Sequence, residues 1–308
     1  MENTIQIPRS KFSIWIQAIR PFSLSASTIP VIVAALYAKV IYPGEIFWFL
    51  FPVAFICAAL FQIGANLVSD YYDFKTKVDR TETFGSSRVL VEGLLTPKAI
   101  YLAGTYCLII GFLLGLTLVY FRGPAILLLG IIGLLGGYFY TAKPVGLKYL
   151  ALGDLTVFLL FGPLMVIGAF LALTGDFSWN AFYVSLPLGF LILAILHANN
   201  TRDILHDSQA NIKTLAMVLG MKGAKAEYYF LIFGSYISII LFVIFKILSP
   251  WSLLVFLSIF PAISNVRSIS SAKVEKPAEI SMLDVKTAQV QLIFGILLSI
   301  GILLQIII

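Results

Sequence analysis

The sequence predicts an all-α membrane protein, because its composition is strongly apolar and its basic residues lie mostly on one side. Of the 308 residues, 60% are hydrophobic and only 12% are charged. In a soluble domain roughly a quarter of the residues are charged, and the core of one soluble domain cannot bury this excess of apolar residues. We expect a single domain, residues 1–308, of about nine transmembrane helices, arranged as two four-helix halves plus one around a central cavity.

Nine apolar runs are each long enough to cross a bilayer, which needs roughly 20 mostly apolar residues. Polar loops separate the runs, and the loops after the second, sixth and eighth runs are long and charged. The expected spans cover about residues 22–42, 46–69, 99–121, 123–141, 151–173, 180–199, 227–246, 250–267 and 289–308.

The basic residues gather on one side of this topology. Nine spans place 18 of the 21 Lys and Arg residues on one face, leave Arg122 and Lys246 on the other, and put Lys39 near the outer end of the first span. Positive residues favour the cytoplasmic side, so we expect a cytoplasmic N-terminus in the cell membrane. Because these residues are spread over short loops, we expect no nucleic-acid partner.

The N-terminus and the cysteines indicate no further function. The polar segment from Met1 to Lys11 lacks the pattern of a cleavable signal, since the next apolar run is long enough to span. Cys57 and Cys107 both lie in apolar runs, where cysteine behaves as a small hydrophobic residue. Their spacing fits neither a disulfide framework nor a zinc site.

Two acidic motifs end the second and sixth spans on the same side of the membrane. Each begins with an Asn that is followed four residues later by an Asp, and helical spacing puts these polar side chains on one face. The repetition indicates two similar halves of the chain. The first motif is Asn66, Asp70, Asp73 and, in the loop beyond, Asp79, and the second is Asn199, Asp203 and Asp207.

The carboxylates of these motifs predict a Mg²⁺–diphosphate site. Carboxylates at helix spacing repel one another unless a cation joins them, and hard oxygen ligands favour Mg²⁺, which bridges to substrate phosphates. Each motif alone could be an ordinary solvated helix end, but both lie at one interface and hold five of the 15 acidic residues. We predict catalytic and metal-binding roles for Asp70, Asp73, Asp203 and Asp207, with Asp79 as a further metal ligand.

Basic and amide groups near the motifs would complete a diphosphate site, because a cation near the leaving oxygens stabilises the departing group. Each basic residue could instead have no role in binding and simply follow the preference of positive residues for the cytoplasmic side of the membrane. The predicted diphosphate-binding residues are Asn66, Lys143, Arg202, Asn199, Lys148 and Arg88.

Asp154 and Tyr140 are candidates for contact with an aromatic acceptor. Asp154 near the start of the fifth span could bind a hydroxyl or act as a base, or it could cap a helix. Tyr140 could shield a carbocation through its π face, or it could belong to an interfacial aromatic belt. His206 reads as a neighbour of the second motif rather than a metal ligand.

These residues resemble the UbiA superfamily of intramembrane aromatic prenyltransferases. Asp203 and Asp207 match its DxxxD motif, and the first motif has the spacing of the MenA branch, with Ser69 where Asn is often found. Residues 20–30, 140–155 and 197–220 are also similar to MenA-type signatures. The likeness covers about residues 15–308.

The resemblance implies nine helices around a central cavity, capped at the cytoplasmic side by the loops that hold the aspartates. It implies Mg²⁺ as cofactor and the joining of a polyprenyl diphosphate to 1,4-dihydroxy-2-naphthoate, which gives demethylmenaquinol with loss of diphosphate and CO₂. Other acceptors of the superfamily stay open: 4-hydroxybenzoate, another quinone precursor or a glyceryl phosphate lipid. A membrane transporter is the alternative of a different class, although its acids would be expected nearer the bilayer midplane.

Overall fold

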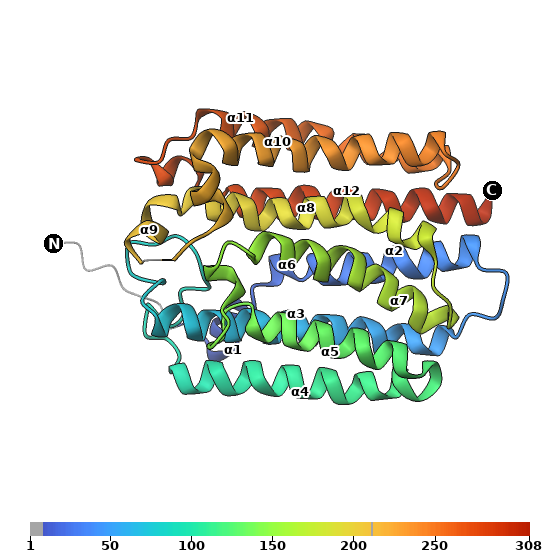
Figure 1. The fold of residues 1–308 in the computed structure, drawn as a ribbon, viewed down its shortest axis with the longest axis horizontal. Coiled ribbons are helices and arrows are strands. Elements are labelled where there is room, and N and C mark those ends of the chain that lie inside the picture. Colours follow the sequence, from blue (N-terminus) through green and yellow to red (C-terminus); the bar gives the residue numbers. More distant parts are fainter. Residues whose placement is uncertain (1–8, 211) are drawn as a thin grey trace.

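The computed structural model describes residues 9–210 and 212–308, which form a bundle of long helices running side by side (Figure 1). One isolated parallel bridge joins Leu150 to Lys213, and no strand is found within the described ranges. The helices are α1 (Lys11–Ile19), α2 (Ser25–Ile41), α3 (Phe51–Lys75), α4 (Pro97–Arg122), α5 (Pro124–Phe139), α6 (Gly153–Leu159), α7 (Met165–Thr174), α8 (Trp179–Arg202), α9 (Ile204–Gln209), α10 (Leu215–Ile244), α11 (Ile259–Ser271) and α12 (Leu283–Ile307).

The long apolar helices make this an integral, multi-pass membrane protein. By length and composition, seven helical segments of the described chain can cross a membrane, or eight if α1 and α2, which meet at 52°, are one broken span. Helix α5 is also apolar but has only 16 residues. The predicted fold class is therefore confirmed, whereas the count of nine spans stays a prediction.

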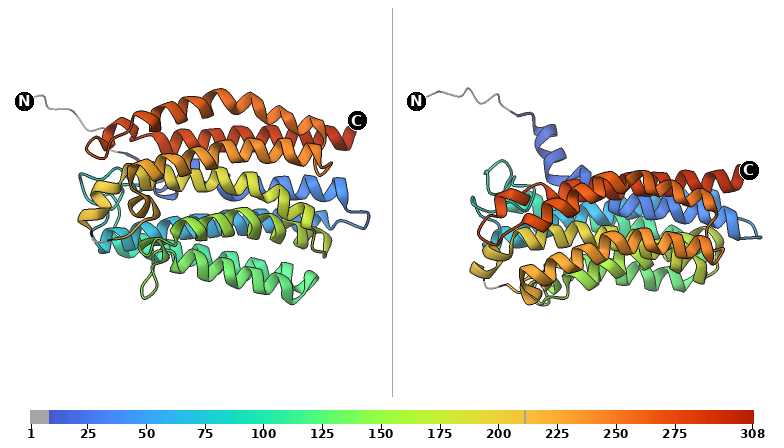
Figure 2. Two further views of the ribbon diagram at one scale, coloured as in Figure 1. Left: turned by 45° about the horizontal axis from the view of Figure 1, so that its top comes forward. Right: turned by 90° about the horizontal axis from the view of Figure 1, so that it is seen from above.

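The two acidic motifs lie at the same end of the bundle. In Figure 1, α3 and α8 both run toward the left end, where α9 and the loop between α3 and α4 also lie, while the C-terminus lies at the right end. Helix α1 projects from the bundle near the left end, as the second view in Figure 2 shows. This arrangement brings residues about 130 positions apart in the chain to one membrane interface.

The fifth expected span is one helical segment in the structure, Gly153–Thr174, with an irregular stretch in its middle. Between α6 and α7 the backbone forms a π-helical segment, η4 (Leu160–Leu164), which contains Pro163. Proline has no N–H to donate, so it disturbs the regular helical hydrogen bonds. Gly162 in this segment lies so close to Gly189 of α8 that a Cβ at Gly162 would sit 2.9 Å from the Gly189 Cα. The irregular segment therefore packs backbone against backbone along one wall of the interior.

The main hydrophobic core lies between the two ends of the bundle. Helix α12 packs against both α2 and α8, and it contacts the 3-10 segment η5 (Pro250–Ser258) before α11. Large, fully or almost fully buried side chains pack in this region, among them Tyr37, Phe170, Tyr228 and Phe294. The packing holds the helices that carry the acidic motifs in fixed positions.

Candidate active site

A cavity that is open to the outside lies where α3 and α8 end. Four of the five predicted acidic residues line it: Asp73 and Asp79 from the first motif, and Asp203 and Asp207 from the second. Asp70 lies just behind the lining and is only 2% exposed. The structure therefore brings the two motifs together around one space, as their shared side of the membrane predicts.

Asp70 is held by partners that the sequence analysis did not single out. The Arg20 guanidinium, at the junction between α1 and α2, donates to one carboxylate oxygen, and the Ser87 hydroxyl donates to the other. Arg20 also lines the cavity and adopts a left-handed backbone conformation at φ 53°. A non-glycine residue in that region is uncommon and often marks a functional position. No local sequence signal links Arg20 to a residue 50 positions away.

Asp73 accepts three hydrogen bonds. Lys148 Nζ donates to Oδ2 over 2.8 Å, Tyr149 Oη to Oδ1 over 2.7 Å, and Ser69 Oγ to Oδ2 over 3.2 Å. Burial by itself lowers the pKa of Lys148, but the charge of Asp73 and further neighbouring groups raise it well above its usual value. Lys148 is therefore a fixed positive charge in the cavity, and its binding of a diphosphate stays a prediction.

The loop that carries Lys148 is tied to the second half of the chain. The Ala151 N–H donates to the Lys213 carbonyl over 2.7 Å, and the Lys213 N–H donates to the Tyr149 carbonyl over 3.2 Å. Lys213 follows the second acidic motif by six residues, counted from Asp207. This backbone pairing is a tertiary contact, so neither segment alone could reveal it.

The second motif pairs with a cation of its own. Arg202 donates to Asp203 in a two-pronged contact, with Nε 2.9 Å from Oδ1 and Nη2 2.7 Å from Oδ2. Its remaining N–H groups reach Asp284 of α12, over 3.1 Å, and the Asn199 side-chain oxygen. Arg202 is 2% exposed and does not line the cavity, so it orients Asp203 and Asn199 in this structure.

Asp79 and Asp207 differ from the other three acidic residues, because the described residues offer neither of them a side-chain ion pair. Burial, followed by the charges of Asp73 and Asp70, raises the pKa of Asp79 to about 7. Burial and the nearby carboxylates raise the pKa of Asp207 to about 7, against an opposing effect of Lys148. Such crowding of negative charge favours the binding of a cation.

The other predicted site residues fall into two groups. Asn66, Asn199 and Tyr140 line the cavity, as does His206, the expected neighbour of the second motif. Lys143 is exposed, and Arg88 pairs with Glu92 and the Thr83 carbonyl. Neither is among the lining residues. The loop between α3 and α4 nevertheless covers the cavity, and Arg80 from this loop donates to Gln209 of α9 over 3.1 Å.

Asp154 lies behind the cavity rather than in its lining. It accepts from the Asn200 amide over 3.3 Å at Oδ2, and its Oδ1 is 3.2 Å from His197 Nδ1. His197 is fully buried, and Glu227 of α10 lies 3.5 Å from the same ring nitrogen. The sequence analysis did not connect His197, Asn200 and Glu227 with Asp154, because the four residues come from three separate helices, α6, α8 and α10.

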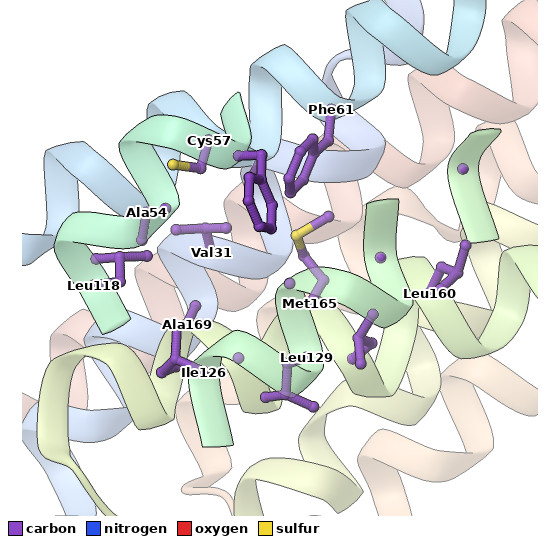
Figure 3. A pocket seen from close by; sticks show the side chains of 18 of the residues that line it. Val31, Ala54, Cys57, Phe61, Leu118, Ile126, Leu129, Leu160, Met165 and Ala169 are labelled. Atoms are coloured by element: carbon purple, nitrogen blue, oxygen red, sulfur yellow. The ribbon is translucent and has the colours of Figure 1, made fainter. Parts of the chain in front are cut away.

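A second, apolar cavity, here called the apolar chamber, is open on one side and adjoins the carboxylate cavity. Figure 3 shows side chains such as Val31, Phe61, Ile126 and Met165 around it. Five residues line both spaces, which are therefore adjacent: Gln62, Ala65, Gly137, Leu160 and Phe161. A charged compartment and an apolar one thus lie side by side.

The side chains around the carboxylate cavity fit a divalent, oxygen-preferring ion. Its carboxylates come from two helix ends that face each other, and two of them lack a cationic partner among the residues described. Carboxylate oxygens without clustered Cys or His are ligands that suit Mg²⁺. Fold and site together define a multi-pass α-helical membrane protein with an acidic site that lies beside an apolar chamber.

The sequence profile of the UbiA prenyltransferase family matches residues 27–283, and the chain belongs to this family. The chain is 32% identical to 1,4-dihydroxy-2-naphthoate octaprenyltransferase of Bacillus subtilis, over 94% of this chain and 92% of that protein. It is 35% identical to UbiA prenyltransferase domain-containing protein 1 of Dictyostelium discoideum, over 97% and 89%. The predicted resemblance is confirmed.

Solved structures share the fold at low sequence identity. A UbiA homologue from Archaeoglobus fulgidus bound to DMAPP and Mg²⁺ has a TM-score of 0.61 and 15% identity, covering 93% of this chain and 99% of that one. A digeranylgeranylglyceryl phosphate synthase gives a TM-score of 0.61 at 18% identity, covering 94% and 98%. The helical arrangement is therefore that of the family.

Proposed function

We propose that this prenyltransferase transfers a polyprenyl group from its diphosphate to 1,4-dihydroxy-2-naphthoate in a Mg²⁺-dependent reaction, a step of menaquinone synthesis. The position of the apolar chamber directly beside the acidic cavity carries this proposal. A polyprenyl diphosphate has a highly charged head and a long apolar tail. The two adjacent spaces match the chemistry of these two parts.

Asp70, Asp73, Asp79, Asp203 and Asp207 are the proposed Mg²⁺ ligands. Bound Mg²⁺ would neutralise the diphosphate as its bond to the allylic carbon breaks. Lys148 and Arg20 now pair with Asp73 and Asp70, and both line the cavity, so they are the protein's own cations for the diphosphate oxygens. Asn66 and Asn199 add amide groups at the two helix ends.

The apolar chamber is the proposed site of the polyprenyl tail and shields the allylic cation from water. Several glycines keep it open: a Cβ placed at Gly115 or Gly130 would meet no atom of the described residues within 4 Å, and at Gly133 the nearest would be Leu164 at 3.6 Å. Glycines that serve helix packing have much closer neighbours, as Gly162 does. These chamber glycines therefore provide volume rather than close helix contacts.

The name of the Bacillus subtilis relative supports 1,4-dihydroxy-2-naphthoate as the acceptor. The eukaryotic relatives carry names that specify no acceptor, so another phenolic quinone precursor is the second candidate. A transporter is not favoured, because the acids lie at the ends of α3 and α8 rather than at mid-span. The 18-to-2 distribution of basic residues supports a cytoplasmic mouth for the acidic cavity.

The acceptor is tested with purified protein, Mg²⁺ and a polyprenyl diphosphate. Parallel reactions contain 1,4-dihydroxy-2-naphthoate or 4-hydroxybenzoate, and mass spectrometry identifies the prenylated product. We expect that only the naphthoate gives a prenylated product, or that it is prenylated at least tenfold faster than 4-hydroxybenzoate. Faster prenylation of 4-hydroxybenzoate would contradict the proposed acceptor and leave the proposed metal site intact.

A further inference from the structure

Asn200 lines the acidic cavity, and the roles proposed above do not use it. Its side chain is 2% exposed, and its Oδ1 has no hydrogen-bond partner among the residues that the structure describes. A buried carbonyl oxygen without a partner loses its hydrogen bonds to water and gains nothing in return. An unsatisfied acceptor in the wall of a substrate cavity indicates that a ligand supplies the missing donor.

The orientation of the Asn200 amide follows from its neighbours. Asp154 Oδ2, 3.3 Å away, is an acceptor, so the amide must turn its N–H₂ group toward it. The opposite orientation would place two oxygen acceptors against each other. Since Asp154 lies outside the cavity lining, the amide oxygen is left on the side away from Asp154.

His197 fixes Asp154 in turn. Its Nε2 lies 2.8 Å from the Ala224 carbonyl, which can only accept, so Nε2 carries a proton. Its Nδ1 lies 3.2 Å from Asp154 Oδ1 and 3.5 Å from Glu227 Oε2, so a proton lies either on Nδ1 or on a carboxyl oxygen that faces it. Both protonation states leave Asp154 Oδ2 as an acceptor toward Asn200. The orientation of the amide therefore does not depend on which atom holds the proton.

Apart from water, including water on a bound Mg²⁺, only one part of the proposed substrates can donate to Asn200 Oδ1. The diphosphate presents acceptor oxygens that face cations, and the polyprenyl tail has no polar hydrogen. A hydroxylated aromatic ring carries O–H donors. Tyr140, whose buried hydroxyl is also without a partner among the described residues, lines the same cavity and could receive or donate a second hydrogen bond.

We propose that Asn200 Oδ1 accepts a hydrogen bond from a hydroxyl group of the aromatic acceptor, and that Asp154 and His197 are positioning residues that hold the amide in this orientation. This inference rests on the proposed function for the aromatic class of the acceptor. It assigns Asp154 an indirect role in acceptor recognition, through Asn200 rather than by contact.

The test compares the wild-type protein with Asn200→Leu, which keeps the shape of the side chain but removes the acceptor and the donor. Equilibrium binding is measured for 1,4-dihydroxy-2-naphthoate, 4-hydroxybenzoate, polyprenyl diphosphate with Mg²⁺, and the two monohydroxy naphthoates. We expect the variant to bind the dihydroxy compound roughly tenfold more weakly, the effect of one lost hydrogen bond that leaves a buried donor unpaired. Its preference for the dihydroxy compound over one monohydroxy analogue should disappear.

Asn199→Leu is the matched control, because the neighbouring amide contacts Arg202 rather than Asp154. It should weaken the binding of the diphosphate more than that of the acceptor. Asp154→Asn, an isosteric change, allows the Asn200 amide to turn over, so it should weaken acceptor binding by a smaller factor and leave diphosphate binding within twofold.

Three outcomes would overturn the inference: unchanged acceptor affinity in Asn200→Leu, an equal loss for acceptor and diphosphate, or a wild-type protein that binds no hydroxylated aromatic compound. An ordered water molecule as the only partner of Oδ1 would give the first of these. Failure of the proposed function is seen separately, as wild-type protein that binds the acceptor and the diphosphate but forms no prenylated product.

Discussion

The acidic cavity and the apolar chamber are neighbouring spaces built in opposite ways. Charged side chains from distant parts of the chain form the first, with Arg20, Asp73, Lys148 and Asp203 drawn together from four segments. The second owes its volume to the absence of side chains, at glycines such as Gly130. The difference teaches that one substrate can be recognised by charge at its head and by free volume at its tail. Changes in the two regions should therefore have effects of different kinds.

The largest effect is expected at the metal ligands of the acidic cavity. Asp203→Ala removes a carboxylate that faces the diphosphate site, so kcat for Mg²⁺-dependent prenyl transfer should fall by about 10²- to 10³-fold. Asp176→Ala is the control, since Asp176 lies at the other end of the bundle, bonded to Tyr42. Membranes that contain each variant are assayed for product. Similar activity in both variants would contradict a role of the acidic cavity in prenyl transfer.

Two lysines of the same loop should respond differently to substitution, because Lys148 lines the acidic cavity and Lys143 does not. Lys148→Ala should lower kcat by about 10²-fold, because Lys148 is the only lysine among the lining residues of the described cavity. Lys143→Ala should change kcat by less than twofold, because Lys143 is exposed and outside that lining. The reverse order of effects would contradict the role proposed for Lys148.

In the apolar chamber the expected effect is selective rather than general. Gly133→Phe fills volume next to Leu164, so kcat/KM for a long polyprenyl diphosphate should fall roughly tenfold or more, while a ten-carbon donor keeps its rate. Leu113→Phe, on the exposed side of α4, is the matched control and should leave both rates unchanged. Equal losses for both donors in Gly133→Phe would contradict a chamber that holds the tail.

The smallest effect is a pH dependence confined to the acidic cavity. Asp79 and Asp207 have a pKa of about 7, so below pH 7 each is mostly protonated and cannot bind metal. The apparent affinity for Mg²⁺ should therefore rise as pH increases from about 6 to 8. Titration of Mg²⁺ in prenyl-transfer assays at several pH values measures this change. Asp79→Asn should weaken the dependence, and an affinity independent of pH would contradict it.

The sequence predicted the acidic cavity better than the apolar chamber, for a physical reason. Helical spacing alone places Asp70 and Asp73 on one face, and charge topology alone puts both motifs at one interface. The partner Arg20 could not be found this way, because its approach to Asp70 depends on the bend between α1 and α2. The chamber could not be predicted either. The sequence does not show whether a glycine such as Gly130 faces a neighbouring helix or an open space.

The most direct test of the account is a structure of the complex with Mg²⁺ and a non-hydrolysable polyprenyl thiolodiphosphate. The account predicts metal ions and the diphosphate between Asp73 and Asp203, with the apolar tail running past Gln62 into the chamber beside Gly133. A tail that leaves the acidic cavity by another route, with the chamber empty, would contradict the account.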